Sequence, residues 1–232
     1  MRTRTVAIVQ ARMGSIRFPG KMISQLGGIT LIEWVLMRLS KTTTLDNIIL
    51  ATSLEKSNDI LEGLAQKIGI SSFRGSEEDV LSRFLGAAKA SEAKNIVRVC
   101  ADNPFIDPYE VDRLVDYFFN NQCDYVCNHR NYGENKYADG FGAEILTLSL
   151  LEQIESLSIT SYHREHVTSF LFDHVADYTI HAMIPPQDLA YPKLRFDVDR
   201  LEDLHKLQAM VNAGVNINSS ASSIVKIALG ID

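Results

Sequence analysis

Short apolar runs alternate with helical segments through the first half of the sequence, and this alternation limits the possible folds. The runs are rich in β-branched residues, as is typical of strands buried on both faces, and they lie at 6–9, 47–51, 70–73 and 95–100. The helical segments lie at 30–41, 57–68, 76–91 and from 107 to about 121. This order predicts an α/β fold with a doubly wound, mostly parallel sheet.

Three of the predicted helices carry recognisable start signals. Thr30 and Glu33 form a capping box, the pattern in which a hydroxyl and a carboxylate satisfy the first amides of a helix. Ser57 is expected to cap the second helix. Asp107 followed by Pro108 marks the start of the fourth, with aspartate as the cap and proline at the first helical position.

The alternation loosens after residue 121. Residues 123–147 hold a strand-like segment and a polar stretch with Gly133, Gly140 and Gly142, which we interpret as an excursion over the active site. Helices are expected at 149–157, 162–173, 201–211 and 219–229, and a strand at 177–183 that pairs with 194–198. We therefore predict a single domain, 1–232, with an inserted substrate-side subregion at about 123–180.

Charge is distributed unevenly along the chain. Residues 1–41 hold seven Lys/Arg against one acidic residue, whereas the whole chain has a net charge of -6. Nucleic-acid binders usually show a broad basic face, so this pattern favours a small anion site instead. No run approaches the roughly 20 apolar residues of a membrane span, and the start has no signal-peptide pattern. Three scattered cysteines indicate neither zinc nor a disulfide framework, so a cytoplasmic protein is expected.

The loop after the first predicted strand is the basic segment. It holds Arg12, Arg17 and Lys21 together with Gly14 and Gly20. Glycine allows the backbone to approach a ligand, and in open α/β sheets ligands bind at the carboxyl ends of strands. The loop is thus predicted to cradle a polyphosphate, although its spacing matches neither the P-loop nor the dinucleotide fingerprint. A basic surface loop is the alternative.

Aspartates follow two later strands. Asp102 comes after the fourth strand, and Asp197 and Asp199 stand two apart near the end of the last predicted strand. Mg²⁺ is held by one or two carboxylates together with phosphate oxygens and water, so these positions suit a magnesium site. Asp102 as a turn residue and Asp199 as the cap of the following helix are the alternatives.

The loop pattern Ala-Arg-x-Gly-Ser-x-Arg-x-Pro-Gly-Lys, from Ala11 to Lys21, resembles the nucleoside-triphosphate loop of cytidylyltransferases that activate sugars. The likeness is greatest to the type of spore coat polysaccharide biosynthesis protein F and the acylneuraminate cytidylyltransferases. Two further blocks, at 98–108 and 198–204, match that family, and the resemblance runs through nearly the whole chain in five blocks.

The resemblance implies a Rossmann-like nucleotidyltransferase fold and a reaction. Such an enzyme transfers CMP from CTP to a sugar, typically an acidic 2-keto sugar, and releases pyrophosphate with the help of Mg²⁺. It also implies a homodimer that serves surface polysaccharide or glycan synthesis, with CTP and a small sugar as its partners.

The same resemblance assigns roles to individual residues. Catalysis falls to Lys21, Arg12 and Arg17, and nucleotide binding adds Ala11, Gly14, Ser15, Arg74 and Asp102. The metal maps to Asp102 and Asp199, while Asp197 stands where the family often has threonine. Acceptor binding maps to Asp139, Glu144, Arg164 and His166, with His166 as a possible general base. A solvated surface is the alternative for the acceptor group.

Two other functions fit parts of the sequence. Asp197-x-Asp199 resembles the metal motif of glycosyltransferases that use a finished nucleotide-sugar. A catalytically silent nucleotide-binding module is the other alternative, and the intact Lys21 and Asp102 argue against it.

Overall fold

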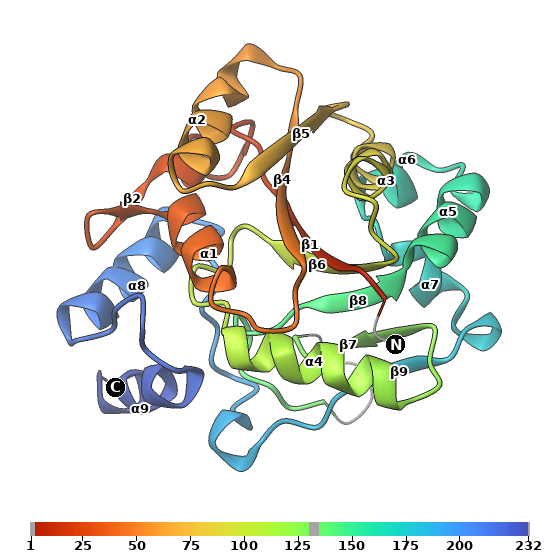
Figure 1. Ribbon diagram of the computed structural model, residues 1–232. Coiled ribbons are helices and arrows are strands. Elements are labelled where there is room, and N and C mark those ends of the chain that lie inside the picture. The colour runs from red at the N-terminus through yellow and green to blue at the C-terminus, as the bar shows by residue number, and fades with distance from the viewer. Residues whose placement is uncertain (1–2, 130–134, 232) are drawn as a thin grey trace.

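The computed structural model describes residues 3–129 and 135–231, which form a seven-stranded sheet with helices on both faces (Figure 1). The strands of this sheet are β1 (Thr5–Gln10), β4 (Asn47–Ser53), β5 (Ser71–Gly75), β6 (Asn95–Cys100), β7 (Tyr125–Cys127), β8 (Glu144–Thr147) and β9 (Ile180–Ala182). A separate two-stranded hairpin joins β2 (Gln25–Leu26) to β3 (Ile29–Thr30).

Helices cover both faces of the sheet. The α-helices are α1 (Leu31–Leu39), α2 (Asp59–Lys67), α3 (Val80–Ala90), α4 (Pro108–Asn120), α5 (Leu148–Leu157), α6 (Ser161–Glu165), α7 (Ser169–Asp173), α8 (Leu201–Asn212) and α9 (Ala221–Ile231). The short 3-10 turns are η1 (Lys21–Ile23), η2 (Lys56–Asn58), η3 (Val175–Asp177) and η4 (Gln187–Leu189). Within the described ranges, no helix is long and apolar enough to cross a membrane.

The sheet order is β5-β4-β1-β6-β8-β7-β9. β1 pairs in parallel with β4 on one side and with β6 on the other. The chain moves outward from β1 through β4 to β5 and then crosses back to β6, so the direction of winding reverses between β1 and β6. β8 alone runs antiparallel to its neighbours, β6 and β7. The predicted doubly wound, mostly parallel sheet is confirmed.

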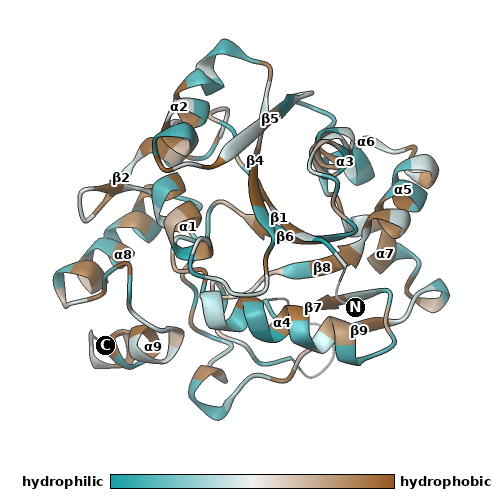
Figure 2. Ribbon diagram, in the orientation of Figure 1, coloured by the Kyte–Doolittle hydropathy of each residue, from teal (hydrophilic) through white to brown (hydrophobic). Residues whose placement is uncertain are grey.

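Alternate residues of β1 enter two different cores. Val6 and Ile8 pack with α3, α5 and α7, whereas Ala7 and Val9 pack with α1, α2, α4, α8 and α9. All four side chains are fully buried, as period-two alternation predicts for a strand covered on both faces. In Figure 2 the central strands are largely brown, whereas the helices carry both colours, as expected for strands covered on both faces and helices with one exposed face.

Local signals placed the first helices well. Thr30 and Glu33 form the predicted capping box of α1, and Asp107 caps α4. Ser57 does not cap α2, since it lies inside η2. The predicted helix at 162–173 is wrong in one respect. It is divided into α6 and α7, because the backbone leaves helical geometry at His166 (φ −106°, ψ 84°).

The prediction that 177–183 pairs with 194–198 is wrong. β9 pairs in parallel with β7 at the sheet edge, and Arg195 instead forms an isolated parallel bridge with Asp139. The predicted polar excursion is only partly as expected, since its strand-like start is β7 and residues 135–143 are largely irregular but well buried. Phe141 and Ala143 are buried, and β8 is inserted between β6 and β7. Gly133 lies outside the described residues.

A buried ion pair ties the two ends of the fold together. One carboxylate oxygen of Asp107 accepts hydrogen bonds from the amides of Tyr109 and Glu110, and the other accepts one from Ala221 N at 2.7 Å, where α9 begins. Arg38 of α1 lies 3.5 Å from the second oxygen. Burial lowers the pKa of Arg38 to about 10 while Asp107 acts in the opposite direction, so the charge of Arg38 depends on this partner.

Replacing Asp107 with alanine should therefore destabilise the protein by more than the loss of a helix cap. Leaving Arg38 buried without its partner should cost about 3–5 kcal/mol. Thr147→Ala, which removes only the cap of α5, should cost about 1 kcal/mol. Urea unfolding of both variants measures the difference, and equal losses would contradict the role given to the buried pair.

Candidate active site

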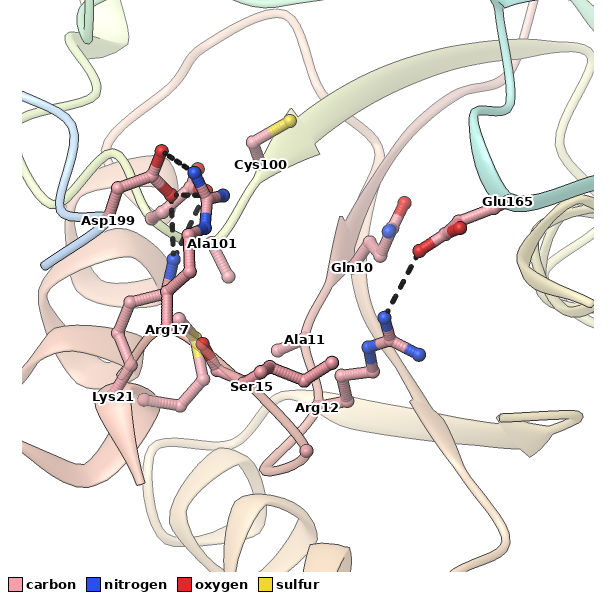
Figure 3. Close-up of a pocket in the computed structure, with 14 residues that line it drawn as sticks. Gln10, Ala11, Arg12, Ser15, Arg17, Lys21, Cys100, Ala101, Glu165 and Asp199 are labelled. Atoms are coloured by element: carbon pink, nitrogen blue, oxygen red, sulfur yellow. Dashed lines mark hydrogen bonds and ion pairs between the residues drawn. The ribbon is translucent and has the colours of Figure 1, made fainter. Parts of the chain in front are cut away.

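A pocket of about 460 Å³ opens where β1 and β6 end side by side. Ligands in open α/β sheets bind at this kind of position, where the winding reverses at the carboxyl ends of the strands. The loop after β1 forms most of its wall, and the loop after β6, α6 and the segment before α8 supply the rest (Figure 3). The basic loop after β1 therefore lies where the direction of winding of the sheet reverses.

Lys21 is the centre of one end of the pocket. It follows Gly20, which has a left-handed backbone (φ 72°) that turns the chain into η1. Its side chain is only 9% exposed, and its Nζ lies 3.4 Å from Asp102 Oδ2 and 3.6 Å from Asp199 Oδ1. One ammonium thus stands between two carboxylates that come from distant parts of the sequence.

The backbone around Asp199 holds its carboxylate toward Lys21. Val198 N donates to the carbonyl oxygen of Asp102 at 2.8 Å, which joins the two carboxylate-bearing segments. Asp203 accepts from Asp199 N and Arg200 N at 2.9 and 2.8 Å. The N-cap of α8 is Arg200, and Asp203 satisfies the two amides just before the helix, so the alternative role of Asp199 as a helix cap does not apply.

Arg17 completes this end of the pocket. Its two terminal nitrogens lie 2.9 and 3.0 Å from the two carboxylate oxygens of Asp199, a bidentate pair. The Arg17 side chain is 63% exposed, so solvent screens the pair and an anion can reach the guanidinium. Figure 3 shows Arg17 and Lys21 converging on Asp199 from the same loop.

Arg12 lies at the opposite end. Its guanidinium donates to the carbonyl oxygen of Glu77 at 3.3 Å and to Glu165 Oε1 at 3.3 Å. The loop lies beside Glu77 here, since a Cβ on Gly14 would stand 2.9 Å from Oε1, the end of a side chain that can shift.

Six residues that line this pocket were not predicted from the sequence, and three of them, Gln10, Cys100 and Glu165, carry polar or titratable side chains. Glu165 lies between two residues that were predicted for the acceptor, and it alone of the three lines the pocket. Gln10 and Cys100 are the last residues of β1 and β6, and they are register partners. Their position at strand ends was the available signal. Burial raises the pKa of Cys100 to about 11, so its thiol stays protonated near neutral pH.

Of the other residues predicted for the nucleotide site, three line the pocket and one does not. Ala11, Gly14 and Ser15 line the pocket as expected. Arg74 does not, because it lies on β5 and pairs with Asp59 at 2.6 Å and Glu62 at 3.3 Å. Those two carboxylates of α2 turn its side chain along the sheet edge, away from the loop after β1.

Asp197 and Asp199 have different partners. Arg195 donates to the two oxygens of Asp197 at 3.0 and 2.7 Å, and Asp197 does not line the pocket that holds Lys21. The glycosyltransferase interpretation places both aspartates in one metal motif, whereas only Asp199 of the two lines this pocket. Asp139 lies nearby, and burial, together with the charge of Asp197, raises its pKa.

Glu144 lies at the start of β8 and is fully buried. It accepts from Arg98 Nη1 at 2.7 Å and from His129 Nε2 at 2.9 Å. The neighbouring Cys100 and Glu144 hold the pKa of Arg98 above its usual value, although burial alone would lower it. Glu144 therefore orients other side chains and does not form part of the pocket wall.

Arg164 and His166 also lie outside the pocket lining. Arg164 pairs with Asp79 and, at 2.9 Å, with Glu155, which joins α6 to the start of α3 and the end of α5. His166 is exposed, and its ring centroid lies 4.7 Å from that of Tyr162. Both residues flank Glu165, so the predicted segment reaches the site through a different side chain.

The donor set of Asp102 and Asp199 suits a magnesium ion. Both carboxylates already face one cation, the Lys21 ammonium, and both are partly exposed to the pocket. Magnesium takes one or two protein carboxylates and completes its shell with phosphate oxygens and water. Among the described residues, no group of three or more His, Cys, Asp or Glu lies close enough together to hold a metal ion.

Sequence comparisons agree on one family. A family model described as Cytidylyltransferase matches residues 6–219. The chain is 34% identical over 224 residues to spore coat polysaccharide biosynthesis protein SpsF of Bacillus subtilis, covering 94% of this chain and 91% of that protein. It is also 33% identical over 200 residues to an uncharacterized protein of Methanocaldococcus jannaschii, covering 86% of this chain and 80% of that protein.

Solved structures share the fold. A cytidylyltransferase from Leptospira borgpetersenii superimposes with a TM-score of 0.92 at 30% identity, covering 99% of this chain and 95% of that one. CMP:2-keto-3-deoxy-manno-octonic acid synthetase, solved with CTP, gives a TM-score of 0.68 at 15% identity, covering 92% and 100%. The second likeness concerns the Rossmann-like nucleotidyltransferase fold alone. By its sequence model, its relatives and its fold, the chain belongs to the cytidylyltransferase family.

Proposed function

We propose that this protein transfers CMP from CTP to a sugar, forming a CMP-sugar and pyrophosphate. The observation that carries the proposal is the Lys21 ammonium between Asp102 and Asp199, with Arg12 and Arg17 in the same pocket. The cations that would bind a triphosphate and the carboxylates that would hold its metal thus lie in one pocket, at the carboxyl ends of β1 and β6. Membership of the cytidylyltransferase family supports CTP as the nucleotide.

The basic loop binds the triphosphate in this proposal. Arg12, Arg17 and Lys21 exchange their carboxylate partners for phosphate oxygens, and the loop amides add hydrogen bonds. The acceptor oxygen then attacks the α-phosphorus in line, and the bond to the pyrophosphate oxygen breaks as the acceptor hydroxyl releases its proton to water. Lys21 and the arginines stabilise the charge that grows on the leaving group.

Asp102 and Asp199 would hold Mg²⁺ on the phosphates. A bound magnesium ion supplies positive charge that polarises the phosphoryl oxygens. The protein's own contribution is to fix the two carboxylates, through the Val198–Asp102 hydrogen bond and the amides capped by Asp203. Most of the rate enhancement then comes from positioning and electrostatics, without a protein nucleophile.

An acidic 2-keto sugar is the acceptor that we propose. Two relatives support this class by their names, 8-amino-3,8-dideoxy-manno-octulosonate cytidylyltransferase and the CMP:2-keto-3-deoxy-manno-octonic acid synthetase. Asp139 and Glu165 are the candidate hydroxyl contacts, while Glu144 positions Arg98 and His129. The proposal includes a cytoplasmic homodimer that serves surface glycan synthesis, as the name of the Bacillus subtilis relative suggests.

The direct test is pyrophosphate release with Mg²⁺, using CTP, UTP, GTP, ATP or dTTP against a panel of keto-sugar acids and sugar phosphates. Release is expected with CTP and a keto-sugar acid. Release only with UTP or dTTP and a sugar phosphate would contradict the proposed nucleotide and acceptor.

Lys21→Ala should lower turnover by about 10²–10³-fold, because it removes a charge directed at the leaving group. Lys67→Ala is the matched control, since Lys67 is 71% exposed and pairs only with Glu33 in the described structure. Steady-state rates at saturating CTP measure the effect. A rate for Lys21→Ala close to that of the control would exclude the phosphate-binding role of the loop.

Asp102→Asn should raise the Mg²⁺ concentration for half-maximal activity by about tenfold, within the range seen when metal-site partners are lost. Asp197→Asn should shift the same titration far less, because Asp197 is bound by Arg195. Equal shifts in the two variants would show that Asp197 is a metal ligand after all.

A further inference from the structure

A second cavity, of about 440 Å³, adjoins the active-site pocket. The two cavities share Arg17 and Asp199, so the bidentate pair between these residues forms the wall between them. The rest of the second cavity comes from the segment before α8 and the first turns of that helix: Lys193, Arg195, Asp197, Arg200, Asp203 and Lys206. We call it the α8 cavity.

The acidic side chains of the α8 cavity are already engaged. Asp197 is held by Arg195, and Asp203 accepts the amides of Asp199 and Arg200. Asp199 is held by Arg17. The amides that Asp203 accepts are neutral and leave its charge in place, so three carboxylates face five cations around the cavity, an excess of two positive charges.

Three basic side chains remain without an acidic partner. Lys193, Arg200 and Lys206 form no ion pair with a carboxylate in the described parts of the chain. Lys206 Nζ contacts the carbonyl oxygen of Arg195 at 3.3 Å and lies 6.0 Å from the centre of the Phe196 ring, and both contacts leave its charge unneutralised. The cavity thus presents uncompensated positive charge directly behind Arg17.

Exposed cations are often only solvated, so these three indicate a binding site only if they lie together. They do not lie at random on the surface, because they surround one cavity whose wall is a cation of the triphosphate loop. Arg17 is 63% exposed and can contact an anion from either side. A multiply charged anion that leaves the active-site pocket past Arg17 meets Lys193, Arg200 and Lys206 next.

We propose that the α8 cavity binds the pyrophosphate product as it leaves the active site. This inference rests on the proposed function, in which the bond between the α-phosphorus and the bridging oxygen breaks and pyrophosphate carries away the charge. Pyrophosphate suits the cavity because its several negative charges match the excess positive charge of the side chains that line it.

The test uses inorganic pyrophosphate as the probe, by calorimetry and as an inhibitor of the forward reaction. The double variant Lys193→Gln/Arg200→Gln keeps the contacts of Lys206 and should weaken pyrophosphate binding about tenfold, at about threefold for each exposed charge. CTP affinity should change less than twofold. Lys226→Gln on α9, another exposed lysine, is the control and should leave pyrophosphate binding unchanged. The difference in pyrophosphate affinity between the wild type and the double variant should become smaller at high salt.

The outcomes separate this inference from the function on which it rests. A wild-type protein that binds neither CTP nor pyrophosphate would refute the proposed function itself. Wild-type binding of both, with unchanged pyrophosphate affinity in the folded double variant, would refute the α8 cavity as the product site. A raised KM for the sugar acceptor with unchanged pyrophosphate affinity would also refute it and would assign the cavity to the acceptor. Circular dichroism establishes that each variant is folded.

Discussion

The parallel pairing of β1 with both β4 and β6 is the constraint on which the rest of the structure depends. A strand hydrogen-bonded on both edges and covered on both faces must be apolar throughout, and Val6 to Val9 satisfy this requirement. Because the chain leaves β1 in one direction and returns through β6 on the other side, the two strands end beside an open crevice. The charged groups of the candidate active site line the pocket that opens at this crevice.

The cations of the first loop are held by carboxylates from elsewhere in the chain. Arg12 is bound by Glu77 and Glu165, and Lys21 by Asp102 and Asp199. These contacts give the loop a defined shape before any phosphate arrives, and they limit the repulsion among its charges. In the proposed function, phosphate oxygens replace partners of the same sign, so that binding requires an exchange of ion pairs and little rearrangement of the backbone.

The sequence predicted those parts of the site that depend on local order. Lys21 and Asp102 follow recognisable strands, and the helix caps at Thr30 and Asp107 are short-range patterns. The predictions failed where pairing between distant segments decides the outcome. Glu144 is buried because β8 enters the sheet between β6 and β7, and Glu165 was missed because its partner Arg12 lies far away in sequence. Asp197 is a different case, since its partner Arg195 stands only two residues before it, and this local pair was overlooked.

The link between Val198 N and the carbonyl oxygen of Asp102 has a consequence for protein synthesis. Lys21 is made early and Asp199 late, so a growing chain that already has β1 to β6 still lacks one of the two carboxylates around Lys21. Such a nascent chain carries the basic loop without its full neutralisation. The site is completed only when the segment before α8 has left the ribosome and reached the β1–β6 crevice, which makes the complete pair of carboxylates a property of the finished chain.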